Sequence, residues 1–198
     1  DLAGALIQLG DLKLRRSDTA GARAAYDEAA TRAGGPDAPN TPAALRAAAE
    51  SVERLGDIAL REGRNNDALE RYREVIGLRA RLASLDPGRA DGPVTLAGDR
   101  ARLGDALRAL GDDAAAREAY GACIEPLRPA HEAQPYDPRV AGQLALCLYR
   151  LALVTQGEAR APLEAEAVRV LGPLPEAGLL SNETEQELET LRSSLTSG

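Results

Sequence analysis

The chain has 198 residues, with 24 basic and 31 acidic side chains and a net charge of −7. Ala and Leu together make up about a third of it, while Val and Ile are scarce and Phe, Trp and Met are absent. Since a sheet needs β-branched and aromatic residues, a β-rich fold is excluded and helices are expected. The acidic balance argues against a nucleic-acid partner, and the apolar runs are too short to span a membrane.

The first element expected is a helix in the opening stretch DLAGALIQLGDLKLRR. It contains the string Leu-Gly-Asp at 9–11, which returns at 55–57 and 103–105, after 46 and then 48 residues. In each copy a Tyr follows sixteen residues after the Gly, and an Ala stands four residues before that Tyr. A fourth copy keeps Leu-Ala at 151–152. Three positions that recur together at one period indicate a repeat protein.

Each repeat is expected to contain two helices. In the second repeat, one helix runs from Pro42 to Gly63, and the next starts at Asn65, as its N-cap, and stops before Pro87. The third repeat follows the same plan over 91–111 and 112–131. A small residue in the first helix lets the second approach closely, and Tyr fills the wedge between hairpins. Such hairpins must stack, because one hairpin cannot bury its apolar face alone.

This pattern resembles the tetratricopeptide repeat, whose first helix carries Leu-Gly or Leu-Ala and whose second carries Ala and then an aromatic residue. The matching positions are Leu9, Gly10, Ala22 and Tyr26; Leu55, Gly56, Ala68 and Tyr72; Leu103, Gly104, Ala116 and Tyr120; and Leu151 and Ala152. The family's early Trp is replaced by Leu6, Val52, Arg100 and Leu148, and the period is longer than the family's usual one. The long repeats look like those of large multidomain bacterial proteins.

The resemblance implies an all-α fold, a right-handed α-solenoid of about four hairpins over 1–172, with units at about 1–40, 41–88, 89–136 and 137–172. Residues 173–198 are expected to form a linker and a C-terminal capping helix with a stripe of Leu188, Leu191 and Leu195. The first repeat has no such cap. We therefore expect a fragment of a longer protein, with self-association through the uncapped N-terminal end as an alternative.

The inventory of reactive side chains predicts no enzyme, no metal site and no cofactor. The single histidine, His131, is expected near a helix C-terminus, where the dipole favours its charge. Cys123 and Cys147 lie 24 residues apart without a CxxC pattern, so we expect buried structural thiols rather than a disulfide or a zinc site. No phosphate-binding glycine motif occurs. A reducing cytoplasm is the default expectation.

What remains is a recurring set of charges in the first helices. By resemblance, these helices line a concave groove that binds a protein or an extended peptide, so the chain is expected to be a scaffold or regulatory interaction module. Two alternatives stay open at this point: the charges pair only with each other, or the chain is the sensor arm of an effector enzyme. The candidate partner-binding residues are Arg54, Asp57, Arg61, Arg102, Asp105, Arg108 and Arg150.

Overall fold

A computed structural model describes residues 2–86, 92–172 and 193 of the chain. These residues form α-helices and one short 3₁₀ helix and include no strand, which confirms the all-α helical-repeat prediction. None of the described helices is long and apolar enough to cross a membrane. The chain divides into two compact units, residues 1–92 and 93–198, and each unit is described by itself.

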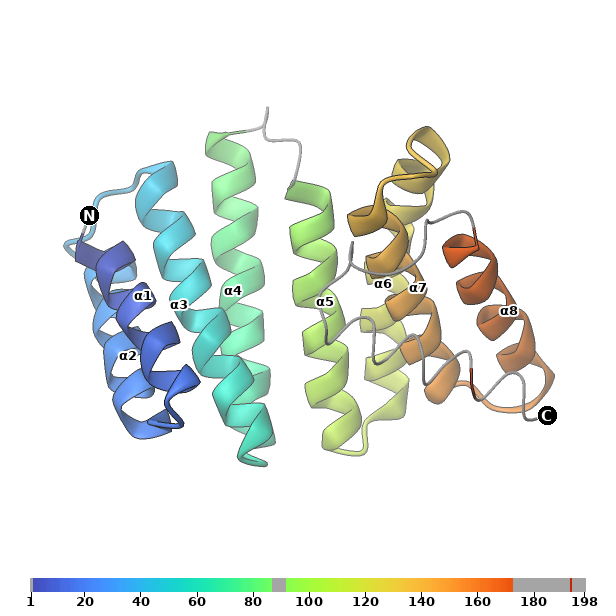
Figure 1. Cartoon of the computed structure of the whole chain (residues 1–198), viewed down its shortest axis with the longest axis horizontal. Helices are drawn as coiled ribbons and strands as arrows, with labels where there is room; N and C mark the ends of the chain where they lie inside the picture. Colours follow the sequence, from blue (N-terminus) through green and yellow to red (C-terminus); the bar gives the residue numbers. More distant parts are fainter. Residues whose placement is uncertain (1, 87–91, 173–192, 194–198) are drawn as a thin grey trace. The chain divides into compact units, whose positions relative to one another are not determined.

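Unit 1 contains the helical hairpins α1–α2 and α3–α4, which can be followed in Figure 1. Helix α2 packs against α1, the other helix of its own hairpin. It also packs against α3, the first helix of the next hairpin. The core at this junction joins Tyr26 and Ala29 of α2 to Leu55 and Ile58 of α3. The helices are α1 (Leu2–Arg15), α2 (Thr19–Gly34), α3 (Pro42–Arg61) and α4 (Asn65–Leu85).

Unit 2 repeats this plan with a larger core. Cys123 and Leu127 of α6 pack with Leu144 and Leu148 of α7, and Leu171 closes the cluster from α8. The helices are α5 (Gly92–Ala109), α6 (Asp113–Ala133), α7 (Pro138–Leu153) and α8 (Arg160–Leu171), with the 3₁₀ helix η1 (Gly157–Ala159) before α8.

Short polar side chains cap the starts of four of the described helices. Asp18, Thr41, Asp112 and Asp137 each accept a hydrogen bond from a backbone N–H in the first turn of α2, α3, α6 and α7. The cap predicted at Asn65 is wrong: Asn65 is the first residue of α4, and Arg64 occupies the cap position without a side-chain hydrogen bond. Asn was expected there for its capping chemistry, but α4 begins one residue earlier than that cap would require.

The turns inside the first three hairpins each contain one residue with positive φ. Ser17, Gly63 and Gly111 have φ values of 62°, 72° and 81°, in the left-handed region, and they occupy the same position of successive repeats. The turn therefore demands a residue that tolerates positive φ. The predicted capping helix within 173–198 lies outside the described residues, apart from Ser193.

Candidate functional site

The repeated glycine of each first helix lies directly under the repeated tyrosine of the second helix. A Cβ atom at Gly10 would come within 2.4 Å of the Tyr26 ring, one at Gly56 within 2.8 Å of Tyr72, and one at Gly104 within 2.4 Å of Tyr120. All three tyrosines are fully buried. The Leu-Gly motif thus exists because the aromatic ring fills the space that a side chain would need.

Each buried tyrosine donates a hydrogen bond to the aspartate that follows the glycine. The phenol oxygens of Tyr26, Tyr72 and Tyr120 lie 2.7, 2.8 and 2.7 Å from Oδ1 of Asp11, Asp57 and Asp105. For Tyr26 and Tyr120, burial and the neighbouring carboxylate raise the pKa well above its usual value, so these phenols stay protonated as donors. The three-residue string therefore encodes a buried polar contact between the two helices of a hairpin.

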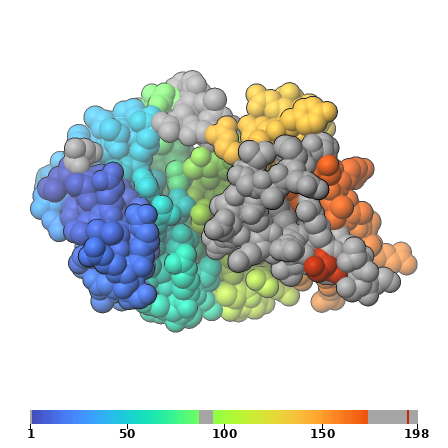
Figure 2. All heavy atoms as spheres, in the orientation of Figure 1, coloured from blue at the N-terminus to red at the C-terminus, as the bar shows by residue number. Residues whose placement is uncertain are grey.

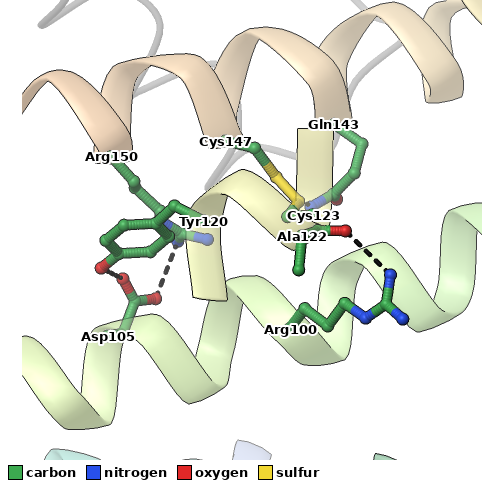
Figure 3. Close-up of a disulfide and its surroundings, with 8 residues drawn as sticks. All are labelled: Arg100, Asp105, Tyr120, Ala122, Cys123, Gln143, Cys147 and Arg150. Atoms are coloured by element: carbon green, nitrogen blue, oxygen red, sulfur yellow. Dashed lines mark hydrogen bonds and ion pairs between the residues drawn. A yellow bond between two sulfur atoms is a disulfide. The ribbon is translucent and has the colours of Figure 1, made fainter. Parts of the chain in front are cut away.

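An arginine from the next hairpin completes this contact within each unit. In unit 1, Nε of Arg54 on α3 lies 3.3 Å from Oδ1 of Asp11. In unit 2, Nη2 of Arg150 on α7 lies 3.3 Å from Oδ2 of Asp105, as Figure 3 shows together with Tyr120. We call each set of Tyr, Asp and following-repeat Arg a polar triad. A triad joins three successive helices and so fixes the stacking of one hairpin on the next.

The candidate partner-binding residues fall into two groups. Arg54, Asp105 and Arg150 belong to polar triads, Asp57 is bonded to Tyr72, and Arg102 is half-buried and engaged in interactions of its own. Arg61 and Arg108 are instead exposed on the last turns of α3 and α5. The structure thus brings Asp11 and Asp105 together with Arg54 and Arg150 of the following repeats and leaves Arg61 and Arg108 exposed.

Another feature of unit 1 was not anticipated from the sequence. A hollow of about 490 Å³ lies between α2, α3 and α4, and Leu55 and Ala59 are its apolar lining residues. The charges around it follow no repeat period, so no pattern in the sequence pointed to it. Its lining residues are Arg23, Asp27, Leu55, Ala59, Arg64, Asp67, Glu70, Arg71 and Glu74.

The prediction of two free thiols is wrong, because Cys123 and Cys147 form a disulfide between α6 and α7 (Figure 3). Their Cα atoms are 6.3 Å apart, and both residues are fully buried. Their separation of 24 residues is half of the 48-residue repeat, which places them on facing helices of neighbouring hairpins. That half-period spacing was the signal available in the sequence. Because disulfides are typical of oxidising compartments, this bond weighs against the cytoplasmic expectation, which stays a prediction.

The structure also describes the surroundings of His131 and Arg100, two further positions named in the sequence analysis. His131 lies in the last turn of α6, as expected. Arg100, at the position of the family's Trp, donates a hydrogen bond of 2.8 Å to the carbonyl oxygen of Ala122 on α6. Among the described residues, no group of His, Cys, Asp and Glu side chains is arranged to hold a metal ion.

The helical hairpins, the Gly-Tyr packing and the polar triads define a helical-repeat protein. A family model for the tetratricopeptide repeat matches residues 100–125, the stretch that carries Gly104, Asp105 and Tyr120. This match supports a tetratricopeptide repeat in that stretch of the chain, and repeats of this family generally act as protein–protein interaction modules. No curated protein matches the chain significantly.

Proposed function

We propose that the chain is a non-catalytic module that binds a protein or an extended peptide along its first helices. The observation that carries this proposal is that some of the repeated charges are paired inside the stack whereas others are exposed to solvent. The polar triads are occupied inside the stack, whereas exposed arginines recur at one position of α1 and α3, as Arg15 and Arg61, 46 residues apart.

These exposed arginines support recognition of acidic groups on a partner. Arg15 and Arg61 occupy the same place in neighbouring hairpins of unit 1, and Arg108 has a similar place at the end of α5 in unit 2. Neighbouring packed helices lie roughly 10 Å apart, so Arg15 and Arg61 within unit 1 would meet carboxylates a few residues apart on an extended peptide. Guanidinium groups suit this role because they bind carboxylates through two parallel hydrogen bonds.

The triad arginines have a different role in this proposal. Replacing Arg54 or Arg150 would remove the partner of a carboxylate that is already bonded to a buried tyrosine. Its effect on binding would therefore come through the stacking of the hairpins. Arg102, which is also engaged, belongs with this group rather than with the contact residues.

The test begins with capture of a partner on the immobilised chain and continues with calorimetry on purified components. Arg61→Glu is expected to weaken binding of the partner at least fivefold. Its unfolding midpoint should stay unchanged, because the side chain is exposed. Arg73→Glu on α4 is the matched control, since it makes the same charge change at an exposed position of a second helix. Equal affinities for the wild type, Arg61→Glu and Arg73→Glu would overturn the proposal.

A further inference from the structure

The hollow of unit 1 is formed by residues that the proposed peptide contacts do not use. Its charged lining comes from α2 and α4, the two second helices, while Leu55 and Ala59 of α3 supply its apolar part. Arg15 and Arg61 are not among its lining residues. In Figure 2, α1 in dark blue and α3 in cyan lie at the surface of unit 1, so the first helices keep a face of their own. A volume of about 490 Å³ lies within the range of known ligand sites.

The arginines that line the hollow already have carboxylate partners. Nη2 of Arg23 lies 2.5 Å from both carboxylate oxygens of Glu62. Nε of Arg64 lies 2.9 Å from Oε2 of the same glutamate. Nη1 of Arg71 lies 3.3 Å from Oε2 of Glu74. An incoming anion would therefore compete with a carboxylate of the chain at each of these arginines.

Two carboxylates of the same lining are left over. Asp27 of α2 and Glu70 of α4 are exposed, and they line the hollow from two different helices. Within the part of the chain that the structure describes, neither side chain makes a hydrogen bond or an ion pair. The lining holds four carboxylates and three guanidinium groups, so its net charge is negative. The hollow therefore favours a cation over an anion.

The packing of the repeats does not require these two charges. The position of Asp27, one residue after the repeated Tyr, holds Arg73 in α4 and Gly121 in α6. The position of Glu70, two residues before that Tyr, holds Ala24 in α2. Positions with a packing role keep their residue from repeat to repeat, as the buried tyrosines do. The two acids are thus particular to the place where they line the hollow.

We propose that the hollow binds the side chain of a lysine or arginine from a partner protein. The cationic head lies between Asp27 and Glu70, which bind it through charge-assisted hydrogen bonds. The aliphatic stem lies against Leu55 and Ala59, because long basic side chains place their methylene groups on apolar surface. This site selects the charge opposite to that selected by the exposed arginines of the first helices, so it goes beyond the proposed function.

The probe for this site is n-butylguanidinium, which reproduces the head and stem of an arginine side chain. It is titrated into the isotope-labelled 198-residue chain at low ionic strength, and amide chemical shifts are followed by NMR. We expect saturable shifts in α2 and α4 around the hollow. The double variant Asp27→Asn, Glu70→Gln keeps the size of both side chains and should weaken binding about fivefold, since two solvent-exposed ion pairs are lost.

The matched control is the double variant Asp37→Asn, Glu118→Gln, which makes the same charge change at two exposed acids outside the hollow lining. Glu118 occupies on α6 the repeat position of Glu70. This control should bind the probe as the wild type does. Methylguanidinium, which lacks the stem, should bind the wild type at least twofold more weakly than n-butylguanidinium, because it covers less apolar surface.

Three results would overturn the proposal. In the first, n-butylguanidinium binds equally to the wild type and to the Asp27→Asn, Glu70→Gln variant. In the second, its shifts lie outside α2, α3 and α4. In the third, butyrate shifts the same amides at lower concentration, which would make the hollow an anion site built on its arginines. The last two comparisons need only the unaltered chain. Arg15 and Arg61 are not changed in any of these measurements, so failure here leaves the proposed function intact.

Discussion

The two units differ in the residues that join neighbouring helices at one position of the repeat. At the junction of α2 and α3 in unit 1, repeat-equivalent positions hold Ala29 and Ser51, both fully buried. At the junction of α6 and α7 in unit 2, those positions hold Cys123 and Cys147, joined by a disulfide. The comparison teaches that this position brings two helices close enough for either small side chains or a covalent bond, while the surrounding repeat stays the same.

The polar triads differ between the units in a parallel way. In unit 1 the side chains of Asp11 and Arg54 are 33% and 34% exposed, whereas those of Asp105 and Arg150 in unit 2 are 16% and 18% exposed. Water therefore screens the first pair more than the second. In unit 2 a covalent bond and a less solvent-exposed ion pair hold the hairpins together. In unit 1 the hairpins are held by packing and by a more solvent-exposed ion pair.

The largest expected effect comes from making unit 2 resemble unit 1. The double variant Cys123→Ala and Cys147→Ser restores the Ala and Ser found at the matching positions of unit 1. Removing a cross-link across 24 residues is expected to lower the free energy of unfolding of unit 2 by about 3 kcal/mol, because the unfolded chain gains conformational freedom. Hydrogen exchange in urea, followed for α6 and α7, measures this change while α2 and α3 serve as the internal reference.

The reverse substitution is the control for that comparison. Ala29→Cys with Ser51→Cys should form a disulfide in unit 1, detectable by peptide mapping without reductant, if the two junctions share one spacing. A dithiol reductant should then affect both units of the variant but only unit 2 of the wild type. Unchanged exchange in α6 and α7 after removal of both cysteines would show that the bond contributes nothing to the difference between the units.

The next effect tests how tightly the Gly-Tyr packing is made in each unit. Gly104→Ala places a Cβ 2.4 Å from the Tyr120 ring, and Gly56→Ala places one 2.8 Å from Tyr72. We expect a loss of about 2 kcal/mol for Gly104→Ala and less for Gly56→Ala, since overpacking a buried ring forces the helices apart. Urea unfolding followed by circular dichroism measures both.

Two other glycines provide matched controls for the helix propensity of alanine. Gly121 on α6 and Gly77 on α4 have open space where a Cβ would lie. Gly121→Ala and Gly77→Ala should therefore stabilise their helices by up to about 1 kcal/mol. If Gly104→Ala were as harmless as Gly121→Ala, the tyrosine ring would not be what requires glycine in the first helix.

The sequence was informative wherever residues recur at the repeat period. The helices and their pairing followed from Leu-Gly-Asp, Ala and Tyr at fixed spacing, because these positions recur in every repeat, whereas the contact of each glycine with a tyrosine ring came from the structure. The disulfide was missed because Cys123 and Cys147 occur in one repeat junction only, and a single pair creates no period. The partners of Arg54 and Arg150 were left open for a different reason: the rotation of one hairpin on the next decides which charges meet.

A smaller effect separates the two triads by their hydration. Tyr120→Phe removes the hydrogen bond to Asp105 and should cost about 1 kcal/mol, because that carboxylate is mostly shielded from water. Tyr26→Phe should cost less, since the more exposed Asp11 can bond to water instead. The two variants keep the aromatic ring, so unfolding in urea reports the hydroxyl alone. Equal losses would mean that exposure of the triad does not decide its strength.

The same tyrosines give a pH dependence of known sign. Their pKa values are raised in the folded chain above the ordinary value of 10.0, so the unfolded chain releases these protons first as pH rises. The contribution of these tyrosines to the free energy of unfolding is therefore complete well below pH 10. It is smaller by about 0.4 kcal/mol per tyrosine at pH 10 and falls further at higher pH. Comparing urea midpoints at pH 8 and pH 10 should show a smaller decrease for the Tyr26→Phe, Tyr120→Phe double variant. An identical decrease in wild type and variant would assign the alkaline loss to other groups.

The smallest effect concerns the one hairpin turn of the three in which a residue other than glycine has positive φ. Ser17 at φ 62° occupies the position of Gly63 and Gly111, and its N–H bonds to Leu14 at 2.9 Å as that of Gly111 bonds to Arg108. Because the hydrogen bond is the same, Ser17→Gly changes only the conformational preference of the turn. A side chain at positive φ lowers the stability of the folded chain by about 1–2 kcal/mol. Glycine removes this cost, but its greater conformational entropy in the unfolded chain offsets part of the gain. We therefore expect Ser17→Gly to stabilise unit 1 by about 0.5 kcal/mol. Gly111→Ser should destabilise unit 2 by a similar or larger amount. Hydrogen exchange in urea on α1 and α6 measures the two changes, and opposite signs are required if one turn geometry serves both units.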